Sequence, residues 1–141
     1  MIIGLGSDIV SMDRVAKQLE RSGKIFKEKY FTAHEITASQ RYAEDNKKGM
    51  ASHFARRFAA KEAFAKAVGT GIGKHIGFKD IGVENDTSGK PFIVLSAKGA
   101  SLLQGLAGEG RHCVCHLSMS DDYPYALAVV IIVSCLPQDS R

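Results

Sequence analysis

The chain has 141 residues, of which 45% are apolar and 24% are charged, so it is long enough for one globular domain with its own core. Its net charge of +4 favours anionic partners and leaves nucleic acid, an acidic protein and a phosphorylated cofactor open. We expect no signal peptide. We expect no membrane span, because the apolar run Tyr125–Leu136 is too short. We expect no disulfide framework, because there are only three cysteines. These features predict one cytoplasmic domain over residues 1–141, with a loose tail from Pro137.

The segment Met1–Val10 alternates in the manner of a β-strand, with Gly4, Gly6 and Asp8 on one face and apolar side chains on the other. Two glycines beside a carboxylate leave room for a ligand to approach the backbone. An aspartate that only ends the strand and begins the next helix is an equally good interpretation.

A helix over Met12–Arg21 follows, with Ser11 as its N-cap and a Ser-Gly pair after its end. Arg14, Lys17 and Arg21 form a basic strip on this helix. A solvated helix face is the usual explanation for such a strip, and docking of an acidic partner is the alternative.

A second helix is expected from about Ala33 to Glu44, because Thr32 and Glu35 have the spacing of a capping box. The charged segment Asp45–Gly49 is then expected to be a loop.

The segment Ala51–Val68 contains no glycine or proline and predicts a long central helix. Phe54, Phe58 and Ala65 recur at helical spacing and form the stripe that should face the core. We expect the rest of the chain to be organised around this helix.

Charged residues border that stripe, which is unusual for an amphipathic helix. Arg57 and Lys61 lie on one side of it and Glu62 on the other. Like charges at positions i and i+4 cost a few tenths of a kcal/mol unless an anion lies between them. Two interpretations remain open. The stems of the cations could cover apolar surface beside a solvated carboxylate, or the cations could hold a phosphate while Glu62 holds a metal ion.

The glycine-rich segment Gly69–Lys74 does not match a phosphate-binding loop, because it lacks two required residues and follows a helix. We interpret it as a C-cap and a connection. Phe78–Glu84 and Phe92–Leu95 then predict a hairpin joined by the turn Asn85–Gly89, and Ala97–Leu106 predicts a short helix.

Two strands complete the chain. His112–His116 carries two histidines and two cysteines, but side chains alternate on a strand, so we expect no zinc site. A turn at Asp121–Pro124 leads to the apolar strand Tyr125–Cys135. Two hairpins among several helices predict one α+β domain, an antiparallel sheet packed on the long central helix.

Four motifs follow one another from residue 4 towards residue 132: Gly4–Val10 with Arg14; Arg57–Ala63 running on to Lys66-Ala67 and Gly69–Gly71; Asn85-Asp86 with Gly89–Pro91; and His116–Ser120 before Tyr125-Ala126. In this order they resemble the 4′-phosphopantetheinyl transferases, in the small single-domain form of the holo-acyl-carrier-protein synthases. The resemblance implies that family's fold. It also implies transfer of the phosphopantetheine arm of coenzyme A to a serine of an apo-acyl carrier protein, with release of adenosine 3′,5′-bisphosphate, in support of fatty acid biosynthesis.

The resemblance also implies roles for particular residues. Asp8 and Glu62 match the catalytic pair that holds Mg²⁺, which fits a carboxylate on a glycine-lined strand and another at the core edge of a helix. The residues that match coenzyme A contacts are Arg57, Lys61, Lys66, Gly89, Lys90 and Pro91. The residues that match carrier-protein contacts are Arg14, Lys17 and Arg21. The proton of the attacking serine could go to Glu62 or to a water, and the sequence leaves both open.

One position departs from the family, because Asp121 stands where many members have histidine. Asp121 could act through water or metal, or it could simply cap the turn. The family also implies a homotrimer with sites between chains. Independently, Tyr125–Leu136 is apolar on both faces, and a neighbouring chain could cover the second face.

A nucleic-acid-binding module without chemistry is the alternative function, since the chain is basic. The exposed segments lack aromatic residues interleaved with basic ones, so we expect no nucleic-acid partner. We also expect no membrane partner, because the longest apolar run is too short to span a bilayer.

Overall fold

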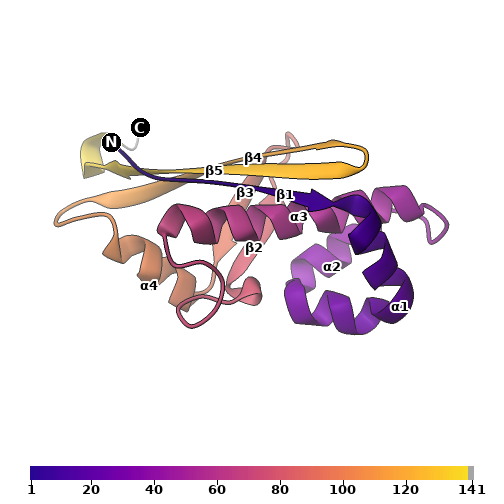
Figure 1. Cartoon of the computed structure of the whole chain (residues 1–141). Coiled ribbons are helices and arrows are strands. Elements are labelled where there is room, and N and C mark those ends of the chain that lie inside the picture. The colour runs from indigo at the N-terminus through magenta and orange to yellow at the C-terminus, as the bar shows by residue number, and fades with distance from the viewer. Residues whose placement is uncertain (140–141) are drawn as a thin grey trace.

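The computed structural model of the chain describes residues 1–139. Its main elements, labelled in Figure 1, are β1 (Ile2–Ser11), α1 (Met12–Tyr30), α2 (Ala33–Ser39), α3 (Lys47–Val68), β2 (Ile81–Asn85), β3 (Pro91–Leu95), α4 (Ala97–Gly105), β4 (His112–Asp122) and β5 (Tyr125–Cys135). Two short 3-10 helices are η1 (Phe78–Asp80) and η2 (Pro137–Asp139). η2 thus replaces the first part of the expected tail, and the rest of that tail lies outside the described residues.

Three long strands form one antiparallel sheet in the order β1-β5-β4, and β2 and β3 pair separately as an antiparallel hairpin. α3 lies along one face of the three-stranded sheet and contacts β1 and β5 (Figure 1). α1 and α2 lie toward the N-terminal end of α3, and α4 lies toward its C-terminal end. The predicted α+β class, with an antiparallel sheet on a long central helix, is confirmed.

Glycines on the inner face of β1 allow α3 to pack very close to this strand. A methyl group at Gly4 would overlap the carbonyl oxygen of Ala67, and one at Gly6 would overlap the carbonyl oxygen of Ala63. The small alanine side chains of α3 permit the same close approach from the other side. The space that we expected a ligand to use is therefore filled by the backbone of α3, which is a correction to the sequence-based interpretation.

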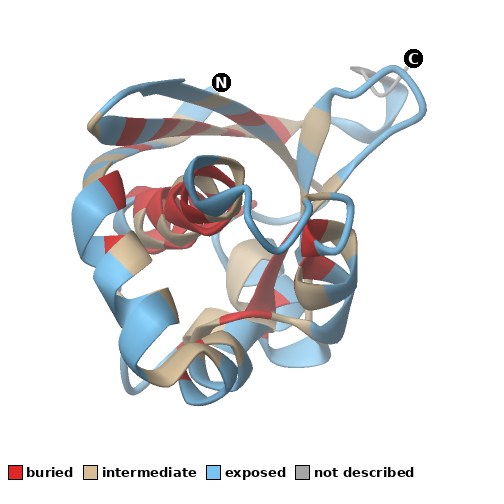
Figure 2. Ribbon diagram, turned by 90° about the vertical axis from the view of Figure 1, so that its right-hand side faces the viewer, coloured by how far each residue is buried: buried red, intermediate tan, exposed pale blue. Residues whose placement is uncertain are grey.

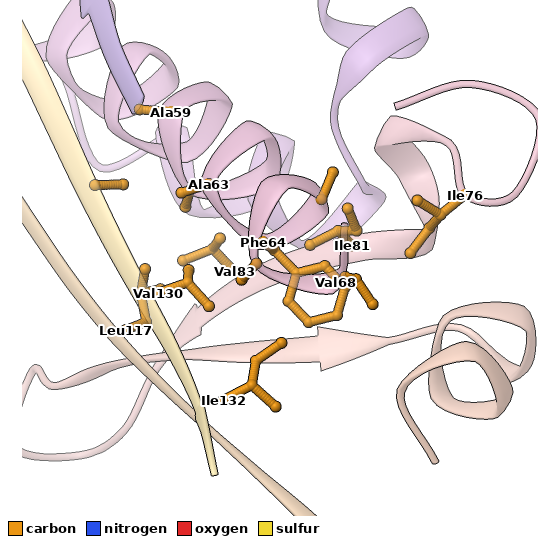
Figure 3. Packing of buried hydrophobic residues seen from close by; sticks show 14 residues of the cluster. Ala59, Ala63, Phe64, Val68, Ile76, Ile81, Val83, Leu117, Val130 and Ile132 are labelled. Carbon is orange, nitrogen blue, oxygen red and sulfur yellow. The ribbon is translucent and has the colours of Figure 1, made fainter. Parts of the chain in front are cut away.

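The main core lies between α3, the hairpin and the three-stranded sheet (Figure 3). Phe64 of α3 points into it and meets Ile81 and Val83 of β2 and Val130 and Ile132 of β5, all of them buried. A second cluster, rich in aromatic rings, joins α1 to the first half of α3 through Phe26, Phe31 and Phe54.

α3 is buried around most of its circumference, and Figure 2 shows it largely red beneath the sheet. Phe54 and Ala65 of the predicted stripe are buried and Phe58 is half-buried, but many residues outside the stripe are buried as well. The sheet, α1 and the hairpin all pack against this helix. A single stripe therefore understates the burial of this helix.

Element boundaries differ from the predictions at several places. Phe78–Asp80, which we expected to begin a strand, forms η1, so β2 begins only at Ile81. α1 continues to Tyr30, with only a kink at Ser22 (φ −154°, ψ 49°), because Phe26 and Tyr30 of its second half pack against each other and the core. α2 ends at Ser39 rather than near Glu44. α3 begins early, at Lys47, because the Asn46 side chain accepts a hydrogen bond from the Gly49 N–H at 2.9 Å.

Two predicted helix ends are confirmed. Thr32 and Glu35 form the expected capping box at the start of α2. Gly69 ends α3 with φ 89°, and its N–H donates to the carbonyl oxygens of Ala65 and Lys66.

Candidate active site

A cavity of about 590 Å³ lies where the end of β1, the start of α1 and the middle of α3 meet. Four of the sequence-predicted site residues line it: Asp8 from β1, Arg14 from α1, and Glu62 and Lys66 from α3. Its apolar walls include Phe58, together with Val15, Phe26 and Tyr30. The cavity therefore combines opposite charges with a partly apolar lining.

Asp8 is held in place by its strand, where its Cα pairs with that of Ala128 in β5. Its side chain is 18% exposed, and Oδ1 accepts a hydrogen bond from Lys66 Nζ at 3.0 Å. The same ammonium also donates to the carbonyl oxygen of Ser7 at 3.0 Å, although the Lys66 side chain is 52% exposed. The carboxylate is thus paired with a cation that reaches it from the surface.

Glu62 lies one helical turn before Lys66 and shares the cavity with Asp8. Burial raises the pKa of Glu62, the negative charge of Asp8 raises it further, and the positive charge of Lys66 opposes both effects. Its carboxylate makes no hydrogen bond or ion pair within residues 1–139. The charge of Asp8 disfavours the ionised form of Glu62, and a site of this kind gains from an added cation.

The donor set suits a hard divalent ion. Asp8 and Glu62 offer oxygen ligands, and magnesium typically binds one or two carboxylates together with phosphate oxygens of a substrate. Across residues 1–139, no group of three or more His, Cys, Asp or Glu side chains could hold a metal ion by itself. The residues therefore fit a magnesium ion that a substrate helps to hold.

The basic strip of α1 is exposed at Arg14, Lys17 and Arg21. Arg14 borders the cavity, whereas Lys17 and Arg21 do not line it. The strip therefore leads from the cavity rim along the surface of α1.

Lys61 does not reach the cavity. It is 0% exposed, and its Nζ donates to Glu35 Oε1 at 2.6 Å, to Phe78 O at 3.0 Å and to Ile81 O at 2.5 Å. Burial lowers the pKa of Lys61 and the neighbouring charge of Glu35 raises it. All three N–H groups are used inside the protein, so the predicted contact of Lys61 with a coenzyme A phosphate does not fit this structure.

Glu35 is the partner that the sequence patterns did not indicate. The capping box predicted its bond to the Thr32 N–H, which is 2.8 Å long. The same fully buried carboxylate also accepts from the Val83 N–H at 3.0 Å and pairs with Lys61. Glu35 thus connects α2, α3 and β2, and this long-range role has no signal in local spacing.

Arg57 is 2% exposed and lies beside the hairpin. Its Nη2 donates to Asn85 Oδ1 at 3.0 Å and its Nη1 to His53 O at 3.2 Å. Burial lowers the pKa of Arg57 to about 10, and nearby Arg56 adds to that effect. The Asn85 amide in turn donates to Gly89 O at 2.9 Å, so Arg57 supports the turn that carries the predicted cofactor contacts.

Eight of the eleven predicted site residues form two groups in this chain, whereas Lys61 is buried elsewhere and Lys17 and Arg21 lie on the surface of α1. The first group lines the cavity: Asp8, Arg14, Glu62 and Lys66. The second group lies at the hairpin turn and its support: Arg57, Gly89, Lys90 and Pro91. None of the second group lines the cavity of the same chain.

Asp121 is exposed near the end of β4, and its Oδ2 accepts a hydrogen bond from the Ser52 hydroxyl of α3. This contact ties the sheet to α3, in place of the turn cap that we considered for this residue.

None of the helices within residues 1–139 has the length and apolar character needed to cross a lipid bilayer.

Comparison with known proteins agrees with the motifs. The family model of the 4′-phosphopantetheinyl transferase superfamily matches residues 4–128. The holo-[acyl-carrier-protein] synthase of Brucella ovis is 47% identical over 132 residues, which are 94% of this chain and 95% of that protein.

Solved structures of the same kind are also similar. Holo-[acyl-carrier-protein] synthase from Neisseria meningitidis superposes with a TM-score of 0.77 at 35% identity, over 94% of this chain and 99% of that one. The Bacillus anthracis enzyme, solved in complex with CoA (3′,5′-ADP), gives 0.73 at 36% identity, over 94% and 96%. The chain therefore belongs to the 4′-phosphopantetheinyl transferase superfamily.

Proposed function

We propose that this protein transfers the 4′-phosphopantetheine group of coenzyme A to a serine of an apo-acyl carrier protein, with adenosine 3′,5′-bisphosphate as the second product. The observation that carries the proposal is the cavity in which Asp8, Glu62 and Lys66 meet, in a chain of this family. The similar proteins are named as holo-[acyl-carrier-protein] synthases, and one was solved with coenzyme A. The proposal includes a cytoplasmic location and a role in fatty acid biosynthesis.

We include Mg²⁺ in this proposal, held by Asp8 and Glu62. Bound there, it would offset the charge that develops on the phosphate oxygens during transfer. Phosphoryl transfer depends mainly on positioning and charge stabilisation, so the chain needs no nucleophile of its own. The attacking hydroxyl comes from the carrier protein. Glu62 is our candidate for accepting its proton, because its carboxylate makes no hydrogen bond within residues 1–139.

The remaining side chains bind and orient. Lys66 offers an exposed ammonium to a phosphate oxygen at the edge of the cavity. Phe58 supplies part of the apolar lining, which would strengthen the electrostatic interactions inside the cavity once bound substrate displaces water. Lys61 is left out of this set of contacts because its three donors are already used.

We propose that the carrier protein docks on the exposed strip of Arg14, Lys17 and Arg21. Such carrier proteins are acidic, and opposite charges on two surfaces mainly speed encounter and set orientation. Arg14 at the cavity rim would then place the incoming serine beside Asp8 and Glu62.

We propose a homotrimer as the working form. The outer face of the three-stranded sheet exposes large apolar side chains, among them Leu5 at 66%, Ile9 at 62% and Leu127 at 41%. Ile9 and Leu127 are neighbours across β1 and β5, and exposed apolar side chains that gather on one face are typical of an interface. Burial by a neighbouring chain would also bring the hairpin turn Gly89–Pro91 of one chain toward the cavity of the next.

The direct test is incubation of the protein with coenzyme A, MgCl₂ and an apo-acyl carrier protein, read by intact mass spectrometry of the carrier. We expect a mass gain of one phosphopantetheine per carrier, no gain without MgCl₂, and none on a carrier whose acceptor serine is alanine. A carrier that stays unmodified in the complete mixture would refute the proposed function.

A further inference from the structure

The ion pair between Lys66 and Asp8 is the contact that most directly affects how the cavity binds ligands. Lys66 Nζ lies 3.0 Å from Asp8 Oδ1 and 3.0 Å from Ser7 O, so both acceptors belong to the same short stretch of β1. The carboxylate it contacts is the more buried partner, at 18% exposure against 52% for the lysine. The half-exposed Lys66 side chain thus forms an ion pair with Asp8, one of the two carboxylates of the cavity.

Lys66 differs from Lys61, which lies five residues earlier on the same helix. Lys61 is fully buried and uses all three N–H groups, so it has no freedom to move. Lys66 is half-exposed, uses two N–H groups, and reaches its acceptors through a flexible four-carbon stem. An ion pair of this exposed kind is weak and easily exchanged.

The position of the ammonium also matters. It contacts the carboxylate that would bind the metal ion, and Glu62, the other carboxylate of the cavity, lies close enough for Lys66 to affect it electrostatically. A divalent cation that binds both carboxylates must compete with Lys66 for Asp8. An anionic ligand in the same cavity offers Lys66 a different partner.

We propose that Lys66 is a displaceable counter-ion of Asp8, which makes the binding of a divalent cation and of a phosphate ligand cooperative. The cation replaces the ammonium at Asp8, and the released ammonium binds a phosphate oxygen. Lys66 cannot bind Asp8 and a phosphate at the same time. Binding of the cation therefore frees Lys66 for the phosphate, and binding of the phosphate frees Asp8 for the cation. This inference rests on the proposed function for the identity of the two ligands, and it assigns the coupling between them to one side chain.

Coupling of this kind is reciprocal, because a ligand that raises the affinity for a second ligand is itself bound more tightly in the presence of the second. Removing the Lys66 ammonium should therefore have two effects. The protein alone should bind the divalent cation more tightly, and the cation should depend less on the phosphate ligand for its affinity.

Isothermal titration calorimetry of the full chain with MgCl₂ and with MnCl₂, in the absence of any nucleotide, tests the first effect. Lys66→Met keeps the length of the stem and removes the charge. We expect it to bind the cation at least about fivefold more tightly than the unaltered protein. Equal or weaker binding by Lys66→Met would overturn the proposal.

Two variants separate the contact from a general change of charge. Arg14→Gln removes a positive charge from the same cavity without removing a contact to Asp8, and it should leave cation affinity within about twofold. Asp8→Asn should lose most of the binding. If Arg14→Gln tightened binding as much as Lys66→Met, or if Asp8→Asn bound normally, the assignment to the Lys66–Asp8 pair would be wrong.

Titration of the cation in the presence of saturating coenzyme A tests the second effect. Coenzyme A should raise cation affinity in the unaltered protein by a larger factor than in Lys66→Met, and equal factors would overturn the proposal. These titrations need no carrier protein. Failure of phosphopantetheine transfer and failure of the Lys66 coupling are therefore separate outcomes.

Discussion

Asp8 and Glu62 place two carboxylates in one cavity, and neither residue belongs to the apolar clusters of the core. We expect Asp8→Ala and Glu62→Ala to lower turnover by at least ~10²–10³-fold, because each removes preorganised charge stabilisation from the transition state. Thermal unfolding should change little, since the Lys66–Asp8 pair is partly exposed. Steady-state kinetics in MgCl₂ measure turnover, and melting curves measure thermal unfolding. Near-normal turnover by either variant would contradict its role as a metal ligand.

The buried pair Glu35–Lys61 gives a second prediction at the scale of single residues. Lys61→Met removes the charge partner of the buried Glu35 carboxylate and the donor to two carbonyl oxygens, so it should lower the free energy of unfolding by about 3–5 kcal/mol. Urea denaturation measures this loss, with the exposed Lys74→Met as the control that should change by less than ~0.5 kcal/mol.

The same variant distinguishes a structural lysine from a phosphate ligand. If Lys61→Met kept normal stability but raised the KM for coenzyme A, the original sequence-based assignment of Lys61 to the cofactor would be right. We expect the opposite result, together with partial recovery of stability in the double variant Glu35→Gln/Lys61→Met, which leaves no unpaired buried charge.

His53 should make stability depend on pH. Burial lowers the pKa of this histidine to about 3, and the positive charges of Arg57, Arg41 and Arg56 add to that effect. Its Nε2 donates to the Glu35 carbonyl oxygen, at 2.9 Å, when neutral. The unfolded chain takes up the proton near pH 6.5 and the folded chain only near pH 3, so the folded state loses stability as the pH falls through this window.

The expected slope is up to ~1.4 kcal/mol per pH unit for one proton. His53→Phe keeps a ring against Tyr42 and Phe54 and removes the titrating group. Urea unfolding at pH 7, 6 and 5 should therefore give a shallower loss of stability for this variant. A slope identical to that of the unaltered protein would exclude His53 as its source.

At the scale of elements, the spacing between β1 and α3 decides the distance between the two carboxylates. Asp8 and Glu62 come from these two elements, which Gly6 allows to meet closely. Gly6→Ala should force them apart, lower the free energy of unfolding by about 1–3 kcal/mol and reduce turnover more than substrate affinity. Gly105→Ala is the matched control, because a methyl group there meets nothing within 4 Å. Normal activity of Gly6→Ala would show that this spacing is not required.

Local chemistry made several elements predictable. The capping box at Thr32, the C-cap at Gly69 and the hairpin around Asn85–Gly89 each depend on residues that are close in sequence, and all three are confirmed. The continuation of α1 beyond Ser22 was not predictable in this way, because it depends on packing of Phe26 against residues far along the chain.

The sequence indicated both carboxylates of the cavity and its cation Lys66, but it did not indicate where Lys61 lies. A resemblance of motifs indicated Asp8, Glu62 and Lys66, and the fold brings these three together. The same resemblance implied a coenzyme A contact for Lys61, but its ammonium donates instead to Glu35 of α2 and to two carbonyl oxygens beyond α3. Whether a helical lysine points to solvent or to the core depends on these tertiary partners, which local spacing does not encode.

At the scale of the whole molecule, two surfaces of one chain remain without partners in residues 1–139. The outer face of the three-stranded sheet exposes Leu5, Ile9 and Leu127, and the hairpin turn Gly89–Pro91 stands apart from the cavity. Cyclic association would cover the first surface and carry the second toward a neighbouring cavity. The trimer that we propose thus links the exposed apolar face to the completion of the active site.

Mixing of variants tests this link. Asp8→Ala disables the cavity of its own chain, and a Lys90→Ala or Pro91→Ala variant disables the turn that we expect to serve the next chain. Each protein alone should be inactive. Co-refolded in equal amounts, they should regain activity at about a quarter of the sites, because random trimers contain that share of intact cavities facing intact turns. Light scattering should give a trimer mass. A monomer mass in an active preparation would reject the assembly, whereas a trimer with no regained activity would place each site within a single chain.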